Sequence, residues 1–223
     1  AGLEENLCWL QQRPLFGKTV LVTRAESQST ELVQQCVEQG ARVLVQPAIE
    51  ISALEDNSQL DAMLAKLDQF DWLVFSSRNG VQFLVDHLLQ TGKDVRALAG
   101  LQLAAIGPGT SQALAGYHLG TDLQPAEYRA EALAEALKPE AADGKRFLLV
   151  RASRGREVLS EMLRDAGGDV QQLVVYQSTD VEYVAPSVLE ELEAGNIDWI
   201  TVTSSAIARS LVSLLGDRLS MAS

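Results

Sequence analysis

Four short loops of the sequence carry small hydroxyl or glycine residues where an apolar run ends and a helical pattern begins. A helix start exposes backbone N–H groups, and a hydroxyl beside them adds a donor, so such a loop suits a carboxylate or a phosphate. Any one of these loops is explained equally by an ordinary helix N-cap. The four together favour a shared anion-binding surface. They are Thr23-Arg24-Ala25, Ser76-Ser77-Arg78-Asn79-Gly80, Gly107-Pro108-Gly109-Thr110 and Thr203-Ser204-Ser205.

Two arginines, Arg24 and Arg151, directly follow apolar runs and are candidates for a carboxylate clamp. The alternative is a surface arginine paired with a nearby glutamate. Arg154 and Arg156 add positive charge beside Arg151 and favour the anion-binding interpretation. Tyr176 is the one phenol that ends an expected strand in the second half of the chain, and it is either a site residue or a half-buried packing residue.

The sequence lacks the motifs that several kinds of binding site and catalytic site require. No G-x-x-x-x-G-K-[ST] loop is present and no G-x-G-x-x-G follows the first apolar run, so nucleotide fingerprints are missing. His87 and His118 have no second ligand at metal spacing. No Ser-His-Asp or Cys-His set is evident, which argues against covalent catalysis. We therefore expect no metal site and no nucleotide cofactor.

Composition narrows the partners and the compartment. The formal net charge of −12 argues against nucleic acid, because that binding rests on phosphate neutralisation by Lys and Arg. We find neither an apolar run long enough to span a membrane nor a secretory signal. Cys8 and Cys36 follow no disulfide or metal spacing. These features predict a cytoplasmic protein, and an apolar content of 47% is enough for real hydrophobic cores.

The elements that must position the four loops belong to an internal repeat. Gly17-Lys18 to Arg24-Ala25 lines up with Gly144-Lys145 to Arg151-Ala152, 127 positions later, and Asp71-Trp72 to Ser76-Ser77 lines up with Asp198-Trp199 to Thr203-Ser204 at the same offset. Two segments sharing one offset indicate a duplicated α/β unit. The counterpart of residues 100–114 would lie beyond Ser223, so we expect the second copy to lack its last strand and helix.

Short apolar runs alternate with amphipathic segments along the chain, which predicts parallel sheets wound by right-handed crossovers. Trp72 and Trp199, equivalent in the repeat, are expected to be packing residues, and Pro139 is expected to end a helix. Strands are expected over residues 20–23, 42–45, 72–75, 103–106, 146–150, 170–176 and 199–202. Helices are expected over residues 3–12, 29–39, 60–67, 81–85, 130–137, 157–166, 186–194 and 206–215, with another opened by Gly107-Pro108-Gly109-Thr110.

The assembled segments resemble the uroporphyrinogen-III synthase family over residues 17–215. The resemblance rests on the order and spacing of several motifs, none of which is diagnostic alone. They are Val22-Thr23-Arg24-Ala25, Trp72-Leu73-Val74-Phe75-Ser76-Ser77-Arg78-Asn79-Gly80-Val81, Ala105-Ile106-Gly107-Pro108-Gly109-Thr110, Leu149-Val150-Arg151-Ala152, Val175-Tyr176 and Asp198-Trp199-Ile200-Thr201-Val202-Thr203-Ser204-Ser205.

The resemblance implies a bilobed α/β protein with two flavodoxin-like, three-layer domains of parallel sheet, joined by a two-stranded linker, with the active site between them. It also implies that the domains interleave. Residues 1–16 would form an N-terminal linker helix, residues 17–48 with 174–223 the first lobe, and residues 49–173 the second. The repeat alone would cut the chain near Gly144.

The reaction that the resemblance implies is the cyclisation of hydroxymethylbilane to uroporphyrinogen III, with loss of water, inversion of the last pyrrole ring and no cofactor. Tyr176 would protonate the leaving hydroxide, since a phenol is protonated at neutral pH. The eight carboxylates of the substrate would meet the hydroxyl loops. The substrate-binding residues expected on this basis are Arg24, Ser76, Ser77, Arg78, Gly107, Thr110, Arg151, Thr203, Ser204 and Ser205.

Two further expectations concern context. Residues 7–18 resemble the joint at which this synthase is fused behind a uroporphyrinogen methyltransferase. Two other functions would show the same loops. One is that of a two-lobed protein that binds an anionic ligand without catalysing a reaction, and the other is that of a flavodoxin-like regulatory module.

Overall fold

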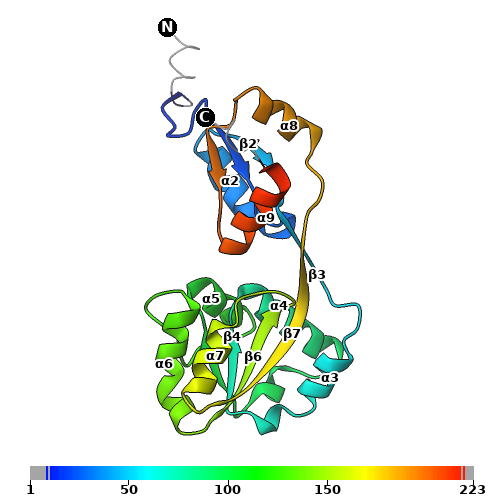
Figure 1. The fold of residues 1–223 in the computed structure, drawn as a ribbon, viewed down its shortest axis with the longest axis vertical. Helices are drawn as coiled ribbons and strands as arrows, with labels where there is room; N and C mark the ends of the chain where they lie inside the picture. Colours follow the sequence, from blue (N-terminus) through cyan, green and yellow to red (C-terminus); the bar gives the residue numbers. More distant parts are fainter. Residues whose placement is uncertain (1–8, 10, 217, 219–223) are drawn as a thin grey trace. The chain divides into compact units, whose positions relative to one another are not determined.

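The computed structural model describes residue 9, residues 11–216 and residue 218, and the chain forms two compact units (Figure 1). Unit 1 contains the residues up to Ile51 and from Thr179 onward, and unit 2 runs from Ser52 to Ser178. The chain passes between them inside β3 (Ile49–Ser52) and β7 (Asp169–Asp180), which are hydrogen-bonded neighbours. Both crossings lie a few residues beyond the expected bounds at 48 and 174, because each strand continues through the connection. The N-terminal helix expected within residues 1–16 falls largely outside the described residues.

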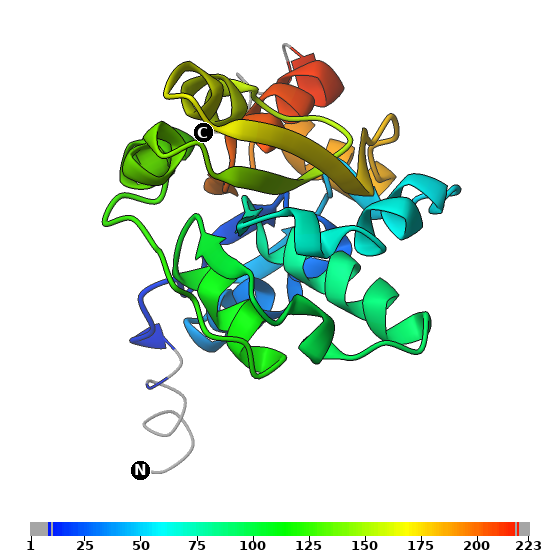
Figure 2. The ribbon, with the colours of Figure 1, turned by 90° about the horizontal axis from the view of Figure 1, so that it is seen from below.

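Unit 2 is built on a five-stranded sheet of order β3-β7-β6-β4-β5, in which β7, β6, β4 and β5 run parallel. The long β7 is the yellow ribbon of Figures 1 and 2. The other strands of this sheet, besides β3, are β4 (Trp72–Phe75), β5 (Gln102–Ala105) and β6 (Arg146–Ala152). The helices of unit 2 are α3 (Ser58–Leu64), α4 (Arg78–Gln90), α5 (Pro108–Gly116), α6 (Ala130–Ala142) and α7 (Val158–Asp165), with short 3-10 turns at Leu67–Gln69 and Val95–Leu98.

Helices cover both faces of this sheet. On one face, α6 and α7 pack on Phe147 and Leu149 of β6 in a core whose side chains are almost wholly buried. On the other face α4 comes so close to β6 that a Cβ added to Gly80 would lie 3.2 Å from Val150 Cγ1. The burial of successive residues on β4 and β6 follows from this coverage and explains their continuous apolar runs.

Unit 1 has a smaller parallel sheet of order β2-β1-β8 within the described residues. Helix α2 packs on Val20 and Val22, and α8 and α9 share a core with Leu21 on the opposite face. The strands are β1 (Thr19–Val22), β2 (Arg42–Val45) and β8 (Trp199–Thr201), and the helices are α2 (Thr30–Glu38), α8 (Pro186–Glu193) and α9 (Ser205–Leu215), with a 3-10 turn at Glu26–Gln28.

The sequence repeat is present in the pairing of the strands. Val20 of β1 pairs with Trp199 of β8 as Phe147 of β6 pairs with Trp72 of β4, again 127 residues apart. The aspartates beside the tryptophans act alike: Asp198 accepts a hydrogen bond from the backbone N–H of Thr19, and Asp71 accepts one from that of Arg146, both at 2.8 Å. The expected duplication is therefore confirmed down to strand register.

Two expectations about individual residues are wrong, and one strand was not expected. Trp72 is 3% exposed, but Trp199 is 61% exposed, because in the described residues no strand pairs beyond β8 as β5 does beyond β4. Pro139 lies inside α6 instead of ending it, since the buried Ala141 still anchors the last turn. Strand β3 was not expected. Its sequence Ile-Glu-Ile-Ser alternates as an edge strand does, but four residues are too short a pattern to predict a strand.

Candidate functional site

Ser77 and Tyr176 meet at the carboxyl end of the unit 2 sheet. Ser77 is the N-cap of α4, and its Oγ accepts a hydrogen bond from the Gly80 N–H at 3.0 Å. The same Oγ lies 3.1 Å from the phenol oxygen of Tyr176 on β7. The serine cap therefore has both an ordinary structural role and a contact with the expected acid.

Tyr176 is held by the aromatic ring of Phe83. The two ring centroids lie 5.3 Å apart with an interplanar angle of 15°, and only 6% of the tyrosine is exposed. Phe83 lies one helical turn after Gly80 on α4, so it faces the same sheet. Sequence reasoning missed Phe83, although its spacing from the N-cap of α4 was a usable signal.

The start of α5 adjoins the start of α4. The exposed side chain of Arg78 lies over the start of α5: a Cβ added to Gly109 would be 3.0 Å from a terminal guanidinium nitrogen of Arg78. Tyr128, also missed by sequence reasoning, covers Gly107 equally closely, with its Cβ and Cγ both 3.0 Å from an added Cβ. A side chain at Gly107 would press on the Tyr128 ring, whereas one at Gly109 would only displace the flexible end of Arg78.

Thr110 lies in the first turn of α5 and is 5% exposed. Its backbone N–H donates to the Gly107 carbonyl at 3.0 Å. Its hydroxyl makes no hydrogen bond to any other residue that the structure describes. Ser76, by contrast, is exposed and donates to the Val150 carbonyl at 3.2 Å. Five of the expected substrate-binding residues, Ser76, Ser77, Arg78, Gly107 and Thr110, thus border one edge of one sheet.

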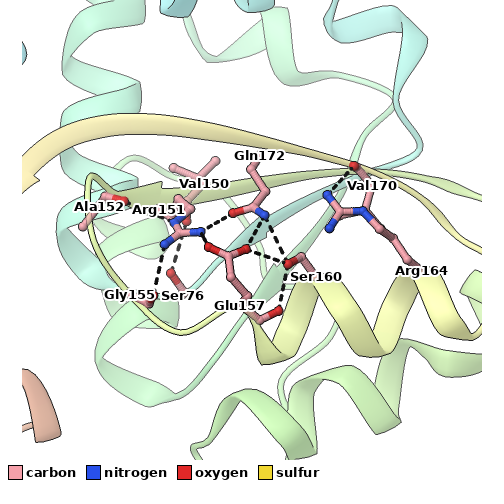
Figure 3. Close-up of polar contacts among 10 residues, drawn as sticks. All are labelled: Ser76, Val150, Arg151, Ala152, Gly155, Glu157, Ser160, Arg164, Val170 and Gln172. Atoms are coloured by element: carbon pink, nitrogen blue, oxygen red, sulfur yellow. Dashed lines mark hydrogen bonds and ion pairs between the residues drawn. The ribbon is translucent and has the colours of Figure 1, made fainter.

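Arg151 is paired with a glutamate, Glu157, which is the second of the two interpretations that the sequence allowed. Its guanidinium contacts the side chains of Glu157 and Gln172, and it donates to the carbonyls of Ala152 at 3.2 Å and Gly155 at 3.3 Å (Figure 3). With these contacts Arg151 holds the β6–α7 loop, and its binding of a substrate carboxylate stays a prediction.

Hydrogen bonds from Arg151, and then from Gln172 and Ser160, lower the pKa of Glu157 to about 2. A carboxyl whose pKa falls on folding stabilises the fold above its ordinary pKa of 4.5, and this contribution is lost as the pH falls toward 2. We expect Glu157→Gln to lower the free energy of unfolding at pH 7 modestly, because the carboxylate is half exposed. Urea titrations of both proteins at pH 7 and pH 3 should show the difference shrinking; an equal difference at both would contradict this ion pair.

The remaining expected residues belong to unit 1. Ser204 caps α9 as Ser77 caps α4, accepting from the Ile207 N–H at 3.2 Å, and Thr203 and Ser205 beside it are exposed. Arg24 Nε donates to Gln28 Oε1 at 3.1 Å. Unit 1 also has a cavity of about 560 Å³, but Glu26 and Glu50 among its lining residues disfavour a carboxylate there.

Two searches of the described residues are negative. No helix among them is long and apolar enough to cross a membrane. No group of three or more His, Cys, Asp or Glu side chains among them is arranged to hold a metal ion.

Comparison with known proteins gives one consistent family. Residues 30–222 match the family model of uroporphyrinogen-III synthase HemD. The uroporphyrinogen-III synthase of Synechococcus elongatus is 31% identical over 211 residues, which are 94% of this chain and 79% of that protein. The porphyrin biosynthesis protein HemD of Ruminiclostridium josui is 25% identical over 97% of this chain, and the chain spans only 43% of its length.

The fold agrees with a solved structure. The crystal structure of a mutant uroporphyrinogen III synthase from Thermus thermophilus superposes with a TM-score of 0.67 at 17% identity, over 92% of this chain and 79% of that one. The α/β architecture with parallel sheets is thus that of the crystal structure, while the sequence matches carry the relationship. The chain therefore belongs to the uroporphyrinogen-III synthase family of porphyrin biosynthesis, and its enzyme class is that family's, EC 4.2.1.75.

Proposed function

We propose that the edge of unit 2 bordered by α4 and α5 holds hydroxymethylbilane, the substrate that the family implies, and that Tyr176 is the acid of the cyclisation. The observation that carries this proposal is the 3.1 Å contact between Ser77 Oγ and the Tyr176 oxygen. It brings the polar end of a buried tyrosine to a helix start flanked by the exposed Ser76 and Arg78.

The chemistry asked of Tyr176 is one proton transfer. The phenol O–H gives its proton to the hydroxyl of the substrate as the carbon–oxygen bond breaks, so water leaves and a pyrrole cation remains. Because Ser77 Oγ already accepts from the Gly80 N–H, its own O–H is available to donate to the tyrosine oxygen and stabilise the phenolate. The proton lost from the pyrrole after ring closure restores the phenol, and the net change is loss of one water.

The carboxylates of the substrate are assigned to groups that attract anions. The N–H groups at the starts of α4 and α5 carry partial positive charge, and Arg78 adds a full one. Thr110 offers a hydroxyl that no described residue uses. The loops of unit 1 that carry Arg24, Thr203, Ser204 and Ser205 provide the same chemistry and stay predicted carboxylate ligands. The main task of these contacts is to hold the chain so that the substituted pyrrole carbon is attacked.

The test is to supply enzymatically made hydroxymethylbilane and to separate the type I and type III isomers of the product. We expect the type III isomer, which requires inversion of the last ring. Formation of the type I isomer alone would contradict the proposal. Tight binding of the substrate without turnover would instead support the ligand-binding alternative.

Thr110→Val tests the carboxylate contact at α5. Removing the hydroxyl while keeping the shape should raise KM about tenfold, the cost of one hydrogen bond to a charged group, with little change in kcat. Thr91→Val is the matched control, since the Thr91 hydroxyl donates to the Leu88 carbonyl at 2.7 Å at the far end of α4. A rise in KM in the control, or none in Thr110→Val, would remove Thr110 from the site.

A fused methyltransferase upstream of residues 7–18 stays part of the proposal. Its support is the resemblance of that segment to the joint of such fusions. The mass of the protein purified from its natural source, together with an assay for methyl transfer, tests it.

A further inference from the structure

Tyr128 presents a large aromatic side chain to solvent at the start of α5. The residue is 63% exposed, yet a Cβ added to Gly107 would lie 3.0 Å from its Cβ and Cγ and 3.2 Å from its Cδ1. One part of the side chain therefore contacts the glycine while most of the ring stays in solvent. The phenol oxygen makes no hydrogen bond to any residue that the structure describes, so contact with Gly107 holds the side chain and a hydrogen bond of the phenol does not.

The segment that carries Tyr128 is fixed on both sides. Before it, the Leu123 carbonyl accepts a hydrogen bond from the Ala105 N–H of β5 at 3.0 Å. The Ser111 hydroxyl of α5 donates to Gln124 Oε1 at 2.6 Å. After it, α6 begins at the second residue beyond the tyrosine and packs in the core of unit 2. The exposed ring thus has a set place beside α5.

Helix α5 has no side-chain cap at the position that the ring covers. Ser77 caps α4 and Ser204 caps α9, but the N-cap of α5 is Gly107, which has no side chain to accept a hydrogen bond. A serine at this position would press its Cβ against Tyr128. The start of α5 therefore carries an exposed aromatic ring where helices ordinarily prefer a hydroxyl or carboxylate cap.

Two groups that attract a carboxylate lie at the same helix start. Thr110 is 5% exposed, and its hydroxyl has no hydrogen-bond partner within the described part of the chain. A terminal guanidinium nitrogen of Arg78 would lie 3.0 Å from a Cβ added to Gly109. The loop of residues 107–110 thus has an aromatic ring against its first glycine, a cation against its second, and an unpartnered hydroxyl on the residue that follows.

The chemistry of this set fits a flat ring that carries carboxylates. An exposed aromatic face suits stacking on another flat ring, and a hydroxyl and a guanidinium suit the anionic arms of that ring. Glu127 would repel such an anion, but it pairs with Arg129 at 2.8 Å. Every pyrrole ring of hydroxymethylbilane carries carboxylate arms, so one ring of that substrate offers both parts at once.

We propose that Tyr128 is a substrate-contacting residue whose ring stacks on one pyrrole ring of hydroxymethylbilane while Thr110 and Arg78 hold the carboxylates of that ring. The proposal rests on the proposed function, because that function supplies the tetrapyrrole, but it does not depend on Tyr176 as the acid. Contacts to carboxylates on flexible arms leave the plane of a pyrrole ring free to turn, and stacking on Tyr128 fixes that plane.

The first experiment compares two substitutions of Tyr128. Tyr128→Phe keeps the ring, whereas Tyr128→Leu keeps apolar contact with Gly107 but removes the aromatic face. We expect KM to stay within about twofold in Tyr128→Phe and to rise about 5- to 10-fold in Tyr128→Leu, which is the range that one aromatic pair contributes, with kcat within about twofold in both. Tyr183→Leu is the matched control, since Tyr183 is 65% exposed and lies in unit 1, and its KM should not change.

Three outcomes of this comparison would overturn the proposal. One is a KM within twofold of the parent in Tyr128→Leu. Another is an equal rise in KM in Tyr128→Phe and Tyr128→Leu, which would assign the effect to the phenol oxygen. The third is a lower free energy of unfolding in Tyr128→Leu, measured by urea titration, with KM unmoved, because a ring that only covers Gly107 would act in that way.

The second measurement observes the ring itself and needs no turnover. The chain has four tyrosines, so labelling with 3-fluorotyrosine gives four fluorine signals, and Tyr128→Phe, Tyr176→Phe and Tyr183→Phe each identify one of them. The probe is uroporphyrinogen III, the product of the reaction, added under anaerobic conditions. The ring current of a stacked pyrrole should displace the Tyr128 signal and leave the Tyr183 signal in place.

The outcomes separate this inference from the proposed function. A Tyr128 signal that stays in place, in a protein that forms the type III isomer, overturns this inference alone. No displaced signal, together with no type III isomer, rejects the proposed function and this inference with it. A displaced Tyr128 signal with unchanged turnover in Tyr176→Phe upholds the stacking and rejects only the phenol of Tyr176 as the acid.

Discussion

Tyr176→Phe is expected to lower kcat for the type III isomer at least about 100-fold, because a positioned general acid contributes about 10²- to 10⁴-fold. The ring of the phenylalanine keeps the stack on Phe83, so packing in unit 2 is preserved. Loss of the contact with Ser77 should reduce the free energy of unfolding by only about 0.5–1.5 kcal/mol. Isomer-resolved kinetics and urea unfolding on the same preparation measure the two effects.

Tyr183→Phe is the control for this substitution. Tyr183 is 65% exposed and lies in unit 1, so removing its hydroxyl should change neither kcat nor stability measurably. Unchanged turnover in Tyr176→Phe would reject the phenol as the acid. A stability loss several times larger than one hydrogen bond would show that the phenol mainly serves packing.

Trp72→Ala is expected to destabilise the protein by about 3–5 kcal/mol, the cost of emptying a large buried site. Trp72 is 3% exposed, packs in the core beneath α6, and its indole N–H lies 3.4 Å from a Glu140 carboxylate oxygen. The repeat supplies a control at the equivalent position. Trp199 is 61% exposed, so Trp199→Ala should change the free energy of unfolding by no more than about 0.5 kcal/mol.

Chemical denaturation of the two alanine variants beside the parent checks this pair. Because each tryptophan follows an aspartate and precedes a branched aliphatic residue, Leu73 or Ile200, the local propensity changes are similar and largely cancel in the comparison. Equal losses in the two variants would mean that Trp199 is covered in solution. Trp72→Ala should also broaden the transition of unit 2, while Trp199→Ala should leave it unaltered.

Most of the fold could be predicted from sequence because it repeats itself. The apolar runs that became β1, β4 and β6 are covered on both faces, and such strands are readable without knowing their neighbours. The edge strand β3 was missed, since four residues at an edge carry little pattern of their own. The helix interior at Pro139 was misjudged because burial of the last turn outweighs one missing hydrogen bond.

The candidate site was predicted in part. Ser77 and Ser204 were recognisable as caps, because capping depends on residues only three positions away. The contact of Ser77 with Tyr176 joins positions 99 residues apart, and no local pattern predicts it. For Arg151 the sequence left a clamp and an ion pair open, and the choice depended on Gln172 from another strand and Glu157 from the following loop.

The sequence by itself determined what is local and what is duplicated: the strands, the caps, the register of β1 with β8 and of β6 with β4, and the family. These features need only neighbouring residues or a second copy of the same signal. The tertiary structure alone decided that Trp72 is buried and Trp199 exposed, and that Tyr176 faces α4. Burial depends on which strand lies next in the sheet. The surroundings of Tyr176 depend on how β7 pairs with β6, including the one-residue shift in register at Arg151 and Ala152, and this pairing exists only in the folded sheet.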